Sequence, residues 1–103
     1  MNHLVSIEES IKRILETPLG SRVMLPEFGS KLYTLIDKRL DQAWRLMFIS
    51  YVFEALKRWE PRIRLRRAVP KTVNDNGEII ISLEMEIKAT NETYQTEVIY
   101  ATA

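Results

Sequence analysis

Residues 79–88 read Ile-Ile-Ile-Ser-Leu-Glu-Met-Glu-Ile-Lys, and this stretch decides the fold class of the 103-residue chain. Every second residue is large and apolar, whereas the positions between them are mostly polar or charged. This alternation is typical of a β-strand with one face on a hydrophobic core and the other in water. Turns are predicted on both sides, by Asn-Asp-Asn-Gly at 74–77 and by Asn-Glu-Thr at 91–93, and the second leads into a strand from Tyr94 to Tyr100.

Another strand is predicted upstream of the first turn, from about Arg62 to Val73. Its inward positions would be Ile63, Leu65 and Val69. Pro70 cannot donate a ladder hydrogen bond, so it indicates an edge strand or a β-bulge. The three strands together predict an antiparallel meander.

Helical signals fill the first half of the chain. Ser6 followed by Glu9 forms a capping box, and apolar residues then recur at helical spacing, which predicts a helix from about Ile7 to Glu16. The stretch 17–30 carries two prolines and two glycines, and four large apolar residues follow Gly20, so we expect a loop that is packed down on the body of the protein. A brief helical segment from about Ser30 to Ile36 is expected after it.

A long helix is predicted from a cap at Asp41 to Trp59, about 28 Å at 1.5 Å per residue. One stripe of this helix is apolar and comprises Trp44, Phe48, Tyr51, Val52, Ala55 and Trp59. Leu46 and Phe53 widen the stripe. Two interpretations stay open: the helix lies between a sheet and smaller helices, or this flank contacts another protein. The expected fold class is α+β in a single domain, 1–103, with N-terminal helices and one long central helix packed on a three-stranded antiparallel β-meander whose edges stay available.

Composition excludes several classes of protein. Fifteen Lys and Arg against 14 Asp and Glu give a net charge of +1, too close to neutral for a surface built to neutralise phosphates. The chain has no cysteine, one histidine (His3) and three scattered glycines, which leaves no triad, thiolate metal site or nucleotide fingerprint. We therefore expect no enzyme activity and no cofactor. Neither a leader nor a membrane span is evident, so a soluble, unsecreted protein is expected.

Two carboxylates, Glu84 and Glu86, share one face of the central strand at a spacing near that used by glycosidases. Acid and base catalysis also requires a cleft that separates their two pKa values, whereas this face should be flat and wet. We interpret the pair as part of a solvated face that bonds to arginines.

Six basic residues lie within the eleven positions 57–67. Arg62, Arg64 and Arg66 are expected on one strand face. Three interpretations stay open, in the order of internal pairing with nearby glutamates (Glu84, Glu86 and Glu97), a protein partner, and nucleic acid.

The sequence Glu60-Pro61-Arg62 is the sharpest local feature. Pro61 disfavours the helical conformation at Glu60, so the long helix should end there and turn directly into a strand. A carboxylate at a helix C-terminus is unfavourable without a cation, so Glu60 should have a partner, either Arg62 or Arg22. The cluster is a buried structural clamp or a docking site.

Three segments together resemble a known family: Ile-Leu-Glu-Thr-Pro-Leu-Gly-Ser-Arg-Val-Met-Leu-Pro-Glu-Phe-Gly-Ser at 14–30, Leu-Ile-Asp at 35–37 and Trp-Glu-Pro-Arg-Ile at 59–63. In order and spacing they resemble the small baseplate-wedge family of contractile phage tails, which includes baseplate assembly protein W and is related to the baseplate component of type VI secretion systems. The resemblance covers nearly the whole chain.

The resemblance implies a structural protein that docks on larger baseplate wedge proteins and nucleates tail sheath assembly by β-strand augmentation. Tail tube or hub proteins and a second copy, paired through sheet edges, are further candidate partners; nucleic acid and membrane are not. The implied location is the host bacterial cytoplasm during assembly and then the virion tail baseplate. The candidate partner-binding residues are Glu60, Pro61, Arg62, Arg64, Arg66 and Arg22.

An equivalent component of a type VI secretion system or another contractile injection particle is the first alternative. A peptidoglycan hydrolase and a nucleic-acid-binding module are more remote.

Overall fold

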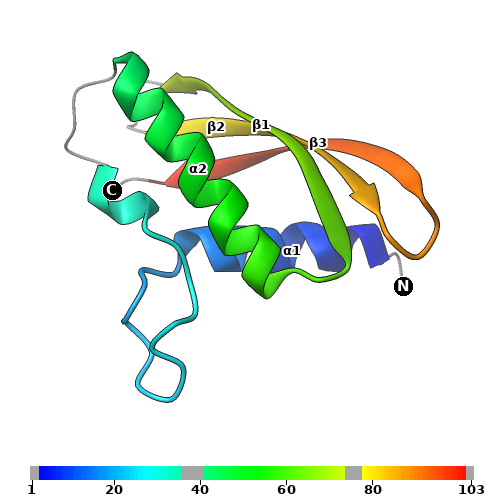
Figure 1. Cartoon of the computed structure of the whole chain (residues 1–103), viewed down its shortest axis with the longest axis horizontal. Helices are drawn as coiled ribbons and strands as arrows, with labels where there is room; N and C mark the ends of the chain where they lie inside the picture. Colours follow the sequence, from blue (N-terminus) through cyan, green and yellow to red (C-terminus); the bar gives the residue numbers. More distant parts are fainter. Residues whose placement is uncertain (1–2, 36–40, 74–77, 102–103) are drawn as a thin grey trace.

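The computed structural model describes residues 3–35, 41–73 and 78–101, so the predicted turn at 74–77 lies outside the described residues. The elements in chain order are α1 (His3–Glu16), the short 3-10 helix η1 (Leu32–Leu35), α2 (Gln42–Trp59), β1 (Ile63–Val73), β2 (Glu78–Ile87) and β3 (Glu92–Ala101). The long helix α2 crosses in front of the sheet, and α1 lies below the sheet in the same view (Figure 1). The predicted α+β fold is confirmed.

Helix α1 begins at His3, one turn earlier than predicted. Ser6 is therefore inside the helix, and the predicted capping box is wrong. The spacing of the apolar residues was sufficient to predict the buried face, because Ile7, Ile11 and Ile14 all lie in the core.

Helix α2 starts at the predicted cap. The Trp44 backbone N–H donates to Asp41 Oδ1 at 2.9 Å, and the Trp44 indole N–H donates to the Leu35 carbonyl at 2.9 Å. Phe48 is buried at the centre of the core, whereas Leu46 on the predicted flank is 60% exposed. No helix within the described ranges is long and apolar enough to span a membrane.

The sheet has the order β1-β2-β3, so β2 is central and both neighbours are edge strands. Alternate residues of β2, from Ile79 to Ile87, face the core, and the buried residues of both helices belong to the same core. The register between β2 and β3 runs without a shift from Glu78 opposite Ala101 to Ile87 opposite Glu92. Pro70 lies in edge strand β1 beside a register shift, as predicted.

A second irregularity in β1 reverses which side chains face inward. Arg66 is an extra residue between Leu65 and Arg67 in the pairing with β2. After this bulge Ala68 is buried, whereas Val69 is only half-buried and pairs on the outer face. The prediction that Val69 points inward is wrong, because one inserted residue exchanges the two faces of a strand.

A polar contact ties α1 to β3. The hydroxyls of Tyr94 and Thr96 both donate to Glu8 Oε1, the latter at 2.6 Å. The hydrogen bonds from Thr96 and Tyr94 lower the pKa of Glu8 and outweigh the opposing effect of burial. The ionised carboxylate thus fixes the first helix against the last strand.

Candidate partner-binding site

A sharp corner joins α2 to β1 at the predicted position. The Glu60 backbone N–H still bonds to the Leu56 carbonyl at 2.9 Å, but its φ and ψ of −125° and 80° are no longer helical. Pro61 follows, and β1 begins at Ile63. The proline thus ends the helix as its effect on the preceding residue requires.

Glu60 is a buried carboxylate that is held from the corner itself and from α1. Arg62 binds it in a fork, with Nε to Oε1 at 2.7 Å and Nη2 to Oε2 at 3.1 Å. The hydroxyl of Ser10 on α1 donates a further hydrogen bond. The Glu60 side chain is 1% exposed and that of Arg62 is 44% exposed. The carboxylate is therefore buried, whereas the guanidinium side of the cluster is accessible to solvent. Ser10 was not predicted, because no sequence signal places α1 against this corner.

The protonation of Glu60 follows from these contacts. Burial alone raises the pKa of Glu60, but the hydrogen bonds from Arg62 and Ser10 and the charge of Arg62 outweigh it, and the net shift is downward. The same bond raises the pKa of Arg62. Glu60 is therefore ionised at neutral pH.

Arg22 does not join this cluster. Its guanidinium lies over the Phe28 ring, 4.5 Å from the centroid, so of the two predicted partners of Glu60 only Arg62 is confirmed. Phe28 in turn meets Trp59 edge to face, with centroids 5.1 Å apart. Arg22 thus belongs to the loop 17–31 and its contact with the end of α2.

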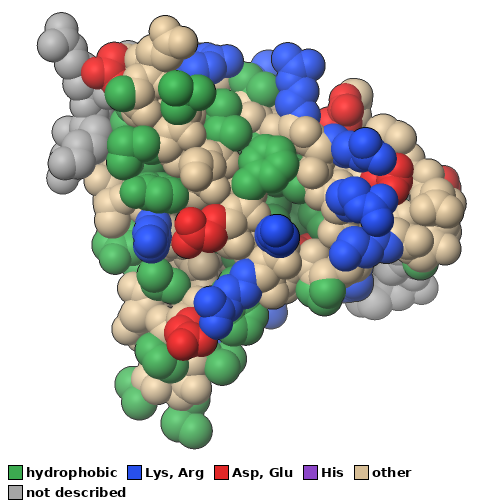
Figure 2. Space-filling view, in the orientation of Figure 1, with side chains coloured by type: hydrophobic (Ala, Val, Ile, Leu, Met, Phe, Trp, Pro, Cys, Tyr) green, Lys and Arg blue, Asp and Glu red, His purple; other side chains and the backbone are tan. Residues whose placement is uncertain are grey.

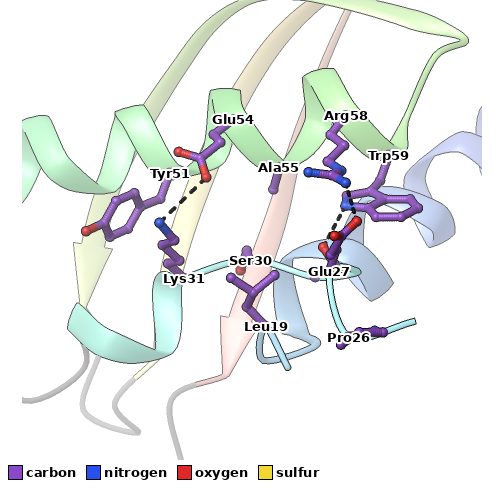
Figure 3. A pocket seen from close by; sticks show the side chains of 11 residues that line it. Leu19, Pro26, Glu27, Ser30, Lys31, Tyr51, Glu54, Ala55, Arg58 and Trp59 are labelled. Atoms are coloured by element: carbon purple, nitrogen blue, oxygen red, sulfur yellow. Dashed lines mark hydrogen bonds and ion pairs between the residues drawn. The ribbon is translucent and has the colours of Figure 1, made fainter. Parts of the chain in front are cut away.

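The base of loop 17–31 is clamped to α2 (Figure 3). Arg58 pairs with Glu27 at 2.5 Å, and the Trp59 indole N–H donates to the Glu27 carbonyl at 3.1 Å. Lys31 lies 3.9 Å from Glu54 one turn earlier on the helix. These contacts surround a cavity of about 240 Å³ between loop and helix.

The tip of the same loop projects away from the body (Figure 1). Val23 is 94% exposed and Met24 89% exposed. The expectation that the whole stretch packs down is therefore wrong for the tip and right for the base, because only the base reaches the rings of α2.

Replacing Gly29 with alanine is expected to loosen the loop base. Gly29 has φ +118°, and an added Cβ would lie 2.2 Å from the Thr17 carbonyl oxygen, so the strain should destabilise the protein by about 1 to 3 kcal/mol. Thermal or urea unfolding measures this loss. Gly20→Ala is the matched control, because Gly20 also has positive φ (+88°) but open space around it; an equal loss in both variants would contradict the close contact.

Arg64 and Arg66 share one acidic partner. Arg64 Nη1 lies 2.5 Å from Glu86 Oε1, and Arg66 Nη2 lies 2.8 Å from Glu86 Oε2. Strand β1 begins at Ile63, so Arg62 lies before the strand and pairs with Glu60 instead. The prediction that it shares one strand face with Arg64 and Arg66 is wrong. Internal pairing, the first of the three interpretations, is confirmed for Arg64 and Arg66.

The remaining carboxylates of the outer sheet face are also engaged. Glu84 accepts a hydrogen bond from Gln95 at 3.0 Å rather than from an arginine, and Glu97 pairs with Lys71 at 2.8 Å. The interpretation that this pair bonds to arginines is therefore confirmed for Glu86 and wrong for Glu84, and no described helix covers the face on which both lie.

A family model matches nearly the whole chain. The model of the baseplate wedge protein gp25 matches residues 2–92. Baseplate protein W of Escherichia phage P2 is 42% identical over 62 residues, which is 60% of this chain and 54% of that protein. The match therefore spans about half the length of this relative.

Two solved structures share the fold. A Geobacter sulfurreducens protein, provisionally called a tail lysozyme, superposes with a TM-score of 0.88 at 28% identity, covering 100% of this chain and 94% of that one. A chain of the postcontracted baseplate of pyocin R2 gives 0.70 at 37% identity, with 84% and 87% covered. The sequence motifs, the fold and these matches agree: the chain belongs to the baseplate wedge protein gp25 family, the structural baseplate proteins of contractile tails.

Proposed function

We propose that this chain docks on larger wedge proteins through the corner at Glu60, Pro61 and Arg62, and that it nucleates the sheath by accepting an extended arm of a sheath subunit as an additional strand. Family membership supports a place among other baseplate proteins. The observation that carries the finer proposal is the regular free edge of β3.

The two edges of the sheet differ in what they offer an incoming strand. Strand β3 pairs with β2 over ten residues without a register shift, and apart from this ladder no backbone–backbone hydrogen bond within the described chain uses a β3 group. Strand β1 has two shifts and carries Pro70, which are features that discourage further pairing. An added strand would therefore find regularly spaced donors and acceptors on β3. A second copy of the chain could use the same edge.

The corner suits docking because it is rigid inside and charged outside. Glu60 fixes the guanidinium of Arg62 in a fork, while nearly half of the Arg62 side chain stays exposed. Arg64 and Arg66 extend this exposed basic surface along β1. Arginines whose planes are held by carboxylates lose little freedom on binding, which favours an interface.

A structural role fits the chain better than hydrolysis, despite the provisional name of the Geobacter protein. The carboxylates at glycosidase spacing lie on the uncovered sheet face and are bonded to Gln95 and to two arginines. A hydrolase would need them in a cleft with separated pKa values. The likeness to a pyocin R2 baseplate chain supports the same structural role in other contractile injection particles.

Adding the purified sheath subunit of the same tail should protect β3 against hydrogen exchange. The outward amides within Glu92–Ala101 are expected to exchange freely in the isolated chain, and a paired strand should slow them by about tenfold or more. Residue-resolved hydrogen–deuterium exchange measures the effect, with the amides of β1 as the internal control.

Each outcome decides a different part of the proposal. Protection of β1 instead of β3 would show that the edge is wrongly chosen. Binding of the sheath subunit without protection of either edge would overturn strand addition altogether.

A further inference from the structure

A second surface feature lies beside the corner, between the end of α2 and the start of β1. This groove has a volume of about 240 Å³. Leu56 and Ile63 form its buried floor, and the half-buried Phe53 and Leu65 form its apolar walls. Phe53 belongs to the flank of α2 for which the sequence left a contact with another protein open.

Three cations surround this apolar surface. Lys57 comes from α2, Arg64 from β1 and Lys88 from the connection after β2. The Lys88 backbone N–H donates to the Arg62 carbonyl at 3.0 Å, which fixes this connection beside the start of β1. Basic side chains accordingly gather around apolar surface beside α2 (Figure 2).

The positive charge of the rim is only partly balanced. Arg64 shares Glu86 with Arg66, and among the described residues neither Lys57 nor Lys88 has an ion-pair partner. Lys57 in the last turn of α2 interacts favourably with the helix dipole, which accounts for one cation. The dipole does not explain Lys88, which converges on the groove from a different element.

We propose that this groove binds an acidic amphipathic segment of a larger wedge protein, with an apolar side chain on Phe53 and Leu65 and carboxylates on the rim. The inference rests on the proposed docking function and names the chemistry of its partner. Apolar contact supplies the anchor, and the complementary charges fix its register and exclude basic segments. The site continues directly into the corner, because Ile63 and Arg64 follow Arg62 in the chain.

The test uses the full chain and a fluorescent synthetic peptide whose leucine face is flanked by glutamates. Fluorescence anisotropy should show binding that weakens as salt is added. Charge reversal at both free lysines, Lys57→Glu with Lys88→Glu, should weaken binding by about tenfold or more. A peptide with lysines in place of the glutamates should prefer the reversed variant.

The matched control is Lys12→Glu with Arg45→Glu, which changes the net charge equally at exposed positions outside the groove. Its affinity for the acidic peptide should stay within about twofold of wild type. Circular dichroism checks that all variants fold. Equal losses in both double variants would overturn the groove, as would binding of single-stranded oligothymidylate in place of the peptide.

Recovery of wedge proteins in a pull-down separates this inference from the function on which it rests. If the reversed groove variant recovers them as wild type does, the groove is wrong and docking stands. If wild type itself recovers none, the proposed docking fails, whatever the peptide does.

Discussion

Arg62→Ala is expected to lower the free energy of unfolding by about 2 to 3 kcal/mol. Among the described residues, the change leaves the buried Glu60 carboxylate with the Ser10 hydroxyl as its one side-chain partner. Removing one partner of a buried pair costs about 3 to 5 kcal/mol, and the exposure of the Arg62 side chain reduces this value. Urea denaturation measures the loss, and a change below about 0.5 kcal/mol would contradict the clamp.

A double variant and the pH dependence distinguish this cause from lost packing. Glu60→Gln with Arg62→Ala removes the buried charge and should regain about 1 kcal/mol over Arg62→Ala. Because the pKa of Glu60 is lowered in the folded state, its stabilisation is complete above about 4.5, the value of a free carboxyl, and is lost as pH falls through the folded pKa. In Arg62→Ala the effect of burial on the pKa of Glu60 is no longer offset by Arg62. The free energies of unfolding of wild type and variant should therefore converge in acid.

Phe48→Ala is expected to have the largest effect on stability, a loss of about 3 to 5 kcal/mol. Phe48 is 1% exposed at the centre of α2 and stacks on Trp44 with ring centroids 5.0 Å apart. Truncation removes this contact and leaves a cavity that the rigid sheet cannot fill. Domains of this size are typically stable by only about 5 to 15 kcal/mol, so a large share of the stability is at stake.

Leu46→Ala is the control for this experiment. Leu46 is on the same helix but 60% exposed, so its truncation should change the free energy of unfolding by less than about 0.5 kcal/mol. Chemical denaturation of both variants in parallel compares them directly. Similar losses for the two would mean that Phe48 does not carry the core.

The spacing of apolar residues was enough to predict the two longer helices and the three strands, because the face of an element that carries apolar residues at a regular spacing is the face that packs in the core. It failed at Val69, where a single bulged residue exchanges the faces of β1. A signal was present, since Arg66 and Arg67 are adjacent charged residues that already break the alternation. The prediction that the whole loop packs down failed for another reason. Val23 and Met24 at the loop tip lie too far from the aromatic rings that hold the loop base.

Half of the corner could be predicted from local chemistry. A proline after a helix requires a turn, and a carboxylate at the end of a helix requires a cation. Arg62 is near enough in sequence to supply this cation. Ser10 and the clamp between Glu27 and Arg58 depend on how distant segments meet. The groove beside Phe53 likewise combines residues from three parts of the chain, and only its helical flank was visible in the sequence.

The bond between Glu8 and the hydroxyls of Tyr94 and Thr96 has a consequence for biosynthesis. The ribosome makes α1 long before β3, so the first helix must wait through translation of the meander before its partners emerge. The part of α1 that packs against β3 is uncovered during that interval, when chaperones and proteases can reach it. Slow codons before β3 should therefore lower the yield of folded subunit more than slow codons after it.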